Sequence, residues 1–167
     1  MKKNRQTLAV GLLSFLTGCN STIAQPDLQN ATGLEFDVLY FRVEMPSSDM
    51  GLMESLINAP GAELSLSASA SFLKGRDDIR VLVVGFADKD ECQSSDCDKL
   101  SRARAFLVFD WLTKVGVSPK KLSGYFGCAD KSPVDFSYTE LQRQGNRRVE
   151  IRALDESAPV EGGDGCV

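Results

Sequence analysis

Histidine is absent from the 167-residue chain. Because histidine is the commonest general base and metal ligand in proteins, its absence disfavours triad hydrolysis and histidine-ligated zinc. Positive charge is also in the minority, since 19 lysines and arginines stand against 23 aspartates and glutamates, a formal net charge of −4. A chain with net negative charge has little attraction for nucleic acid, so we expect no nucleic-acid partner.

The apolar run at the N-terminus, Leu8–Leu16, is too short to span a bilayer as a mature helix. It follows three basic residues and precedes Thr17-Gly18-Cys19, an order typical of an export signal. The small residues before Cys19 look like a bacterial lipobox, which predicts a signal peptide over 1–18 and a diacylated Cys19. Asn20, in place of aspartate, then favours sorting to the outer membrane. An ordinary secretory signal that contains a cysteine is the alternative.

Composition divides the rest of the chain into three parts. Residues 19–33 are polar and contain Pro26, which predicts a flexible linker with an r.m.s. span of about 20 Å. Residues 34–154 carry the hydrophobic patterns of one domain, long enough to bury a real core. Residues 155–167 are acidic and rich in glycine and proline, which predicts a disordered tail.

Hydrophobic periodicity within 34–154 predicts alternating strands and helices. The expected strands are Leu34–Val43, Ile79–Val84, Leu122–Phe126 and Val149–Leu154. The expected helices are Ala62–Lys74 and Arg102–Val115, with a helical turn at Leu52–Ile57 and a further short helix near Tyr138–Gln144. Ser101 is the expected N-cap of the second long helix, whose predicted core stripe is Ala103, Phe106, Leu107, Trp111 and Leu112.

Two residues of opposite charge follow the expected strand Ile79–Val84. Asp88 follows the strand's carboxyl end, and Arg104 lies in the first turns of the next helix. Ligands of open α/β sheets bind at strand carboxyl ends. A carboxylate and a guanidinium placed there could hold the ammonium and the carboxylate of a zwitterion. The structural alternative is that Asp88 and Arg104 pair only with each other.

Three ordered motifs resemble the OmpA-like C-terminal domain family, over roughly Glu35 to Ala153. They are Gly85-Phe86-Ala87-Asp88, Leu100-Ser101-Arg102-Ala103-Arg104-Ala105 and Asn146-Arg147-Arg148-Val149-Glu150. The resemblance implies an α/β (α+β) fold of βαβαββ order, a two-layer sandwich with helices packed on a mixed four-stranded sheet. It also implies non-catalytic binding of peptidoglycan, in which Asp88 and Arg104 hold the diaminopimelate of the peptide stem.

The third motif supplies the remaining predicted contacts, Asn146, Arg147 and Arg148. Alternation along the last strand places Arg147 on the inward side, which favours it over Arg148 as a second contact for an anion. The alternative is two solvated arginines. The sequence departs from the family where Phe86 and Ala87 replace histidine and threonine, and where Cys97 replaces asparagine.

Five cysteines are present, and four remain if Cys19 is acylated. Four cysteines allow three pairings, and an exported protein can form disulfides. Cys92 and Cys97 lie close together in one predicted loop, which favours a disulfide between them and leaves Cys128 to pair with Cys166. A four-cysteine zinc site is the alternative to these disulfides. A calcium-binding loop is disfavoured, because the acidic loop lacks the glycine that calcium loops need.

The leading interpretation is therefore a lipid-anchored domain of the outer membrane that faces the periplasm and binds peptidoglycan, with no enzyme activity, metal or cofactor. The alternative is a protein-interaction module that serves as a scaffold in an envelope assembly. A hydrolase finds little support in a chain that lacks histidine.

Overall fold

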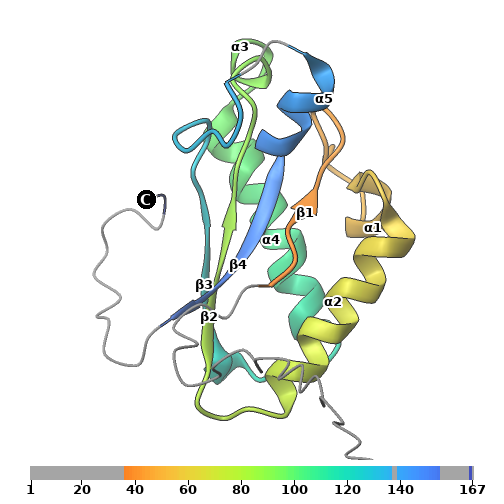
Figure 1. Ribbon diagram of the computed structural model, residues 1–167, viewed down its shortest axis with the longest axis vertical. Helices are drawn as coiled ribbons and strands as arrows, with labels where there is room; N and C mark the ends of the chain where they lie inside the picture. Colours follow the sequence, from red (N-terminus) through yellow and green to blue (C-terminus); the bar gives the residue numbers. More distant parts are fainter. Residues whose placement is uncertain (1–35, 137–138, 155–165, 167) are drawn as a thin grey trace, which may run out of the picture. The chain divides into compact units, whose positions relative to one another are not determined.

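The computed structural model describes residues 36–136, 139–154 and 166 (Figure 1). Predictions for the signal peptide, Cys19, the linker and most of the tail lie outside these residues. In chain order the elements are β1 (Leu39–Tyr40), α1 (Leu52–Ser55), α2 (Ala59–Lys74), β2 (Arg80–Gly85), α3 (Glu91–Ser94), α4 (Cys97–Lys114), η2 (Pro119–Lys121), β3 (Leu122–Gly127), α5 (Glu140–Arg143), η3 (Gln144–Asn146) and β4 (Arg148–Leu154).

The four strands form one mixed sheet in the order β1-β4-β2-β3. β2 pairs parallel with β3, and β4 runs antiparallel to both β2 and β1. The parallel β2–β3 pair needs a crossover, which α4 supplies by packing on both strands. The predicted mixed four-stranded sheet with packed helices is confirmed.

The first strand is much shorter than predicted. Only Leu39–Tyr40 of the expected Leu34–Val43 pairs in the sheet, and positions 34 and 35 lie outside the described residues. Phe41 instead bridges to Leu56, and Glu44 has a left-handed φ of 56°. The chain therefore turns away from the sheet after two residues, although its apolar alternation continues.

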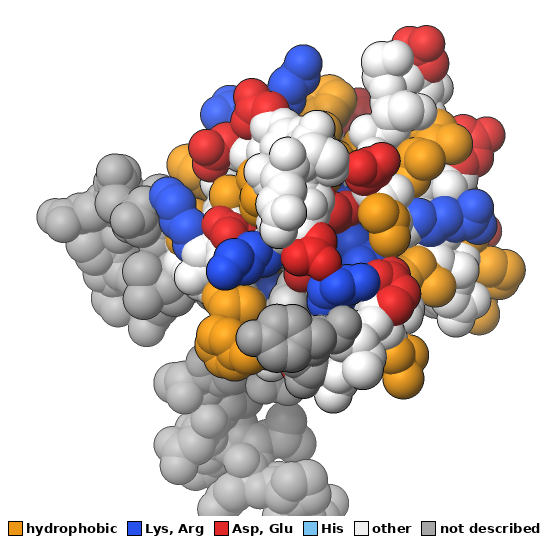
Figure 2. Space-filling view, turned by 90° about the horizontal axis from the view of Figure 1, so that it is seen from above, with side chains coloured by type: hydrophobic (Ala, Val, Ile, Leu, Met, Phe, Trp, Pro, Cys, Tyr) orange, Lys and Arg blue, Asp and Glu red, His pale blue; other side chains and the backbone are white. Residues whose placement is uncertain are grey.

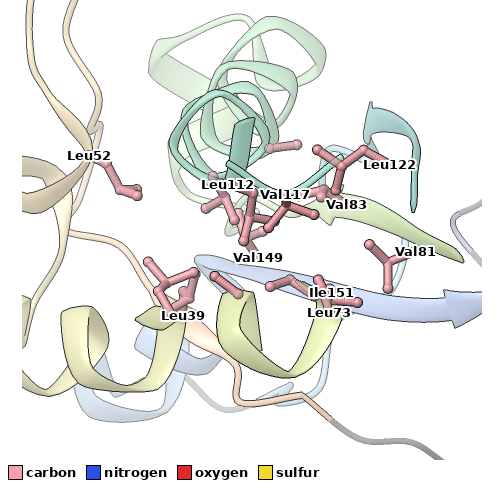
Figure 3. Packing of buried hydrophobic residues seen from close by; sticks show 14 of the residues in the cluster. Leu39, Leu52, Leu73, Val81, Val83, Leu112, Val117, Leu122, Val149 and Ile151 are labelled. Carbon is pink, nitrogen blue, oxygen red and sulfur yellow. The ribbon is translucent and has the colours of Figure 1, made fainter. Parts of the chain in front are cut away.

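The main core lies between one face of the sheet and the helices α2 and α4 (Figure 3). Strand residues with nearly no exposure, such as Val83 and Val149, meet Leu73 of α2 and Leu112 of α4. Burial of such side chains stabilises the fold by about 1.5–3 kcal/mol each.

Two details predicted for α4 are wrong. The helix begins at Cys97, capped by the Asp96 side chain, which accepts from the Lys99 N–H at 3.1 Å. Ser101 is therefore inside the helix, where its hydroxyl accepts from the Ala129 N–H at 3.0 Å. The buried face also differs from the predicted stripe: Phe106 is 45% exposed. The buried residues of α4 are Leu100, Ser101, Arg104, Ala105, Val108 and Leu112.

Close contact between α4 and the sheet explains which helix face is buried. A Cβ added at Gly85 would lie 2.1 Å from the Ser101 carbonyl oxygen, and one at Gly127 would lie 2.5 Å from the Arg102 nitrogen. The ends of β2 and β3 thus touch the helix backbone, so the face that carries Ser101 and Ala105 must point at the sheet.

We predict that Gly85→Ala lowers the free energy of unfolding by about 1–3 kcal/mol or more, because the added methyl group overlaps helix backbone that cannot move aside easily. Gly75→Ala is the matched control. A Cβ there would meet its nearest atoms at 3.7 and 3.8 Å, at ordinary φ. Denaturant unfolding of both variants checks the prediction, and equal stability of the two would contradict it.

The opposite face of the sheet carries a second, smaller cluster. It contains Leu82, Val84, Phe86, Cys128 and Cys166, and Cys128 forms a disulfide with Cys166. The disulfide fixes a residue near the C-terminus against this face. Both faces of β2 are therefore covered, as the unbroken apolar run in its sequence predicts.

Candidate functional site

A small cavity of about 110 Å³ lies beyond the carboxyl end of β2. Its walls come from the segment after β1, from α3 with the residues before it, and from α5 with Arg147. Figure 2 looks onto the end of the molecule where α3 and α5 lie and shows acidic and basic side chains close together there. The lining residues are Val43, Glu44, Asp88, Asp90, Glu91, Ser94, Glu140, Arg143 and Arg147.

Arg104 is fully buried beneath this cavity and has a complete set of partners. Its guanidinium donates to both carboxylate oxygens of Glu91, at 2.6 and 2.9 Å. It also donates to backbone carbonyls of Met45 at 2.8 Å and Phe86 at 3.0 Å. Since its exposure is 0%, no external group reaches the guanidinium in this conformation.

Glu91 was not predicted from the sequence as a site residue. Its carboxylate is buried and accepts two further hydrogen bonds, from the Glu44 N–H at 2.7 Å and from the Asp88 N–H at 2.9 Å. With the two from Arg104, four donors converge on this one carboxylate. Glu91 therefore joins α3, α4 and the segment after β1.

Asp88 does lie at the carboxyl end of β2, as predicted, but its charged neighbour is not Arg104. The Arg143 Nε lies 3.7 Å from the Asp88 carboxylate, beyond hydrogen-bonding distance. That Nε is buried and has no hydrogen-bond partner within the described residues. Asp88 is 3% exposed and lines the cavity. The alternative in which Asp88 pairs with Arg104 is wrong, because each has a different partner.

Arg147 lies on the inward side, as the strand alternation predicted. It is 3% exposed, lines the cavity and forms an ion pair with Glu140 of α5. The hydrogen bond from Arg147 lowers the pKa of Glu140 below its ordinary value. Glu140 therefore stays ionised, and the contribution of this pair to stability is lost only when acid protonates Glu140 below that ordinary value.

Arg148 and Asn146 lie outside the cavity lining. The Arg148 guanidinium lies 3.9 Å from the centre of the Phe86 ring and donates to Glu150 at 2.6 Å. The Asn146 side chain is bonded to the backbone of Val134 and Asp135. These residues are buried, so the alternative of solvated arginines is wrong. A direct role in binding stays a prediction for both.

The three departures from the family pattern have structural roles. Phe86 is the ring on which Arg148 stacks, and it belongs to the second cluster. The Ala87 N–H donates to the Ala129 carbonyl at 2.8 Å, with the side chain buried. Cys97 forms a disulfide with Cys92, which ties α3 to the start of α4. Phe86 and Cys97 therefore add contacts that depend on the changed side chain, whereas the bond of Ala87 belongs to its backbone.

The structure joins the cysteines as the sequence favoured, Cys92 with Cys97 and Cys128 with Cys166. We predict that mass mapping of non-reduced peptides from the exported protein finds both bridges. A peptide that joins Cys92 to Cys128, or free thiols at Cys92 and Cys97, would contradict this. All four sulfurs are used by the disulfides, which removes the four-cysteine zinc alternative.

Among the described residues, no cluster of three or more metal-ligating side chains could hold an ion. No helix in the same part of the chain is both long and apolar enough to cross a membrane.

Comparisons with known proteins give a consistent result. The sequence model of the OmpA family matches residues 54–147, more than half of the chain. Among solved structures, the peptidoglycan-associated lipoprotein from Burkholderia pseudomallei superposes with a TM-score of 0.56 at 20% identity, over 70% of this chain and 89% of that one. No curated protein sequence matches significantly.

Two further solved structures are similar. The C-terminal domain of Helicobacter pylori MotB has a TM-score of 0.56 and 22% identity, over 73% of this chain and 88% of that one. The cell wall anchor of the T6SS from Pseudomonas aeruginosa has a TM-score of 0.51 and 26% identity, over 71% of this chain and 81% of that one. The likenesses to the peptidoglycan-associated lipoprotein and to MotB, at 20% and 22% identity, concern the fold alone.

Proposed function

The chain belongs to the OmpA family, and from this premise we propose that residues 34–154 form a non-catalytic domain that binds peptidoglycan without covalent chemistry. The ligand group is the diaminopimelate of the peptide stem. The protein thereby links the cell wall to the outer membrane. Similarity to structures described as a peptidoglycan-associated lipoprotein and a cell wall anchor supports this proposal.

The observation that carries the proposal is that the buried Asp88 carboxylate has its charged partner, Arg143, beyond hydrogen-bonding distance. A carboxylate that is 3% exposed, at the wall of a cavity, with its charged neighbour 3.7 Å away, has capacity left for a cation. A ligand ammonium that donates directly to Asp88 would form a stronger, charge-assisted hydrogen bond. Asp88 is therefore the residue proposed to bind the ammonium of diaminopimelate, with Arg143 and Arg147 beside it.

Arg104 can contact the ligand only if Glu91 moves away from it. A ligand carboxylate reaches its guanidinium only if Glu91 first gives up four hydrogen bonds. Direct contact between Arg104 and ligand stays a prediction, as do contacts from Asn146, Arg147 and Arg148. The test of the whole proposal is pull-down of the folded protein on purified sacculi. Release of soluble muropeptides during the incubation would contradict the non-catalytic part.

Anchoring through Cys19 is a separate proposal, because that residue lies outside the described part of the chain. It rests on the basic, apolar and small-residue order of residues 1–19. We predict that a fatty-acid probe labels the wild-type protein in cells and leaves Cys19→Ser unlabelled. Two acyl chains are enough for stable membrane anchoring, so Cys19→Ser should also leave the membrane fraction. Equal labelling of both proteins would contradict the anchor.

A protein-interaction role is the second candidate function, and a surface groove favours it. The groove has a volume of about 650 Å³, lies between the segment after β1 and the first half of α4, and includes Met50, Phe106 and Leu107 in its walls. Phe106 is 45% exposed, and exposed apolar grooves are common at protein contacts. Loss of an envelope partner on Phe106→Ser, with sacculus binding unchanged, would support this second function.

A further inference from the structure

We propose that Glu91 is a built-in carboxylate that fills the anion-binding half of the site, so that the cavity selects stem peptides with an ammonium group and no free carboxylate beside it. Such ligands are stems whose diaminopimelate carboxylate is amidated, or whose diamino acid is lysine. This inference rests on the proposed function, because it names the chemical form of peptidoglycan that the same site takes.

The groups around Glu91 form a complete binding site for one carboxylate. A guanidinium and two backbone N–H groups converge on its carboxylate at 2.6–2.9 Å. This set of donors is what an external carboxylate would need. An external carboxylate could gain only the bonds that Glu91 gives up, so the exchange has no net attraction, and it also requires Glu91 to be displaced from its place in α3.

Glu91 is held in place by the short helix α3 and the disulfide next to it. It opens the short helix α3, whose next residue, Cys92, is bridged to Cys97 at the start of α4. The Ser95 N–H donates to the Glu91 carbonyl at 2.9 Å and closes the turn. The side chain is 3% exposed as well. The backbone that carries Glu91 is thus tied to the helix that carries Arg104, and the two charges cannot separate by a loop movement alone.

Acidic side chains outnumber basic ones around the cavity. Five carboxylates and two guanidiniums line the cavity, and the third guanidinium nearby, Arg104, is already paired with Glu91. Both lining guanidiniums also have partners: Arg143 pairs with Asp90 and Glu140, and Arg147 pairs with Glu140. The cavity is net negative, so it attracts an ammonium and opposes a second carboxylate.

The test compares three soluble stem peptides on the intact exported protein by calorimetry: free-acid diaminopimelate, its amidated form, and lysine in its place. We expect the amidated and lysine stems to bind roughly tenfold tighter than the free acid, since like charges brought together in an interface weaken binding strongly. Equal or tighter binding of the free-acid stem overturns the inference. If none of the three stems binds and sacculi are not bound either, the proposed function itself fails.

The Glu91→Gln variant gives a second, independent readout. It keeps the size of the side chain, removes its charge and leaves Arg104 without a charged partner. We expect the preference to shift toward the free-acid stem by about tenfold or more. Glu63→Gln, on the exposed surface of α2, is the control and should keep the wild-type order. An unchanged preference in folded Glu91→Gln would overturn the role given to Glu91.

A thermal measurement covers the case in which this variant folds poorly. Glu91→Ala leaves a space that faces the guanidinium and the two N–H groups, and formate is a carboxylate small enough to enter it. We expect formate to raise the melting temperature of Glu91→Ala and to leave the wild type and Glu63→Ala unchanged beyond the effect of chloride at equal ionic strength. No selective rise would show that this group of donors does not act as a carboxylate site.

Discussion

Arg104→Ala is expected to lower the free energy of unfolding by about 3–5 kcal/mol, the range for removing one partner of a buried ion pair. The reason is that Glu91 would keep a buried charge with only two backbone donors, while carbonyls of Met45 and Phe86 would lose their donors. Chemical denaturation measures the change. Arg102→Ala, two residues away on the exposed side of α4, is the control and should cost less than about 1 kcal/mol.

A double variant separates the ion pair from simple loss of packing. If the cost comes partly from an unpaired charge, Arg104→Met combined with Glu91→Leu should lose less stability than the two single changes added together, because no buried charge is left without a partner. The carbonyls of Met45 and Phe86 still lack their donor in the double variant, so we expect partial recovery. Purely additive losses would contradict that account. Reduced sacculus binding by Arg104→Ala alone therefore cannot be assigned to a ligand contact until folding has been measured.

Asp88→Asn is expected to abolish sacculus binding while the domain stays folded. The change removes a charge and keeps the shape of the side chain, and the expected loss is about 2–5 kcal/mol, or roughly 30-fold and more in affinity. Stability should change little, because the ion pair that is lost spans 3.7 Å. Pull-down with a concentration series gives the affinity, and thermal unfolding checks the fold.

Asp78→Asn is the matched control for this experiment. Asp78 precedes β2, at the other end of the strand from Asp88, where it pairs with Arg76 on the exposed surface. The same chemical change at that end should leave binding unaltered. Wild-type affinity in folded Asp88→Asn would rule out Asp88 as the ammonium contact and would favour the protein-interaction function instead.

Elements whose signal is local were predictable from the sequence. The apolar run of β2 and the helical period of α2 both agree with the structure. The prediction of β1 failed because a distant contact decides: β1 stops at Tyr40 since the chain after it bonds to α1. The predicted start of α4 failed for a local reason, since the Asp96 side chain caps the helix through the Lys99 N–H and Ser101 lies inside it.

At the candidate site, the positions of two residues were predictable from the sequence, but their partners were not. Motif spacing located Asp88 at the strand end and Arg104 on the helix, and both lie where it put them. The partners of these residues were not predictable. Glu91 and Arg143 reach them from α3 and α5, each only four residues long, and no sequence period distinguishes those carboxylates and guanidiniums from solvated ones.

The contact of Gly85 and Gly127 with the backbone of α4 has an entropic consequence for the cavity beside them. Backbone packed against backbone leaves no side chain that could reorient, so the strand end before Asp88 and the helix turn of Arg104 keep a fixed separation before any ligand arrives. A ligand then does not have to order these two elements, and that part of the usual entropic loss on association is absent. If the cavity binds the stem peptide as proposed, its recognition is preorganised and its selectivity depends on the charges already in place.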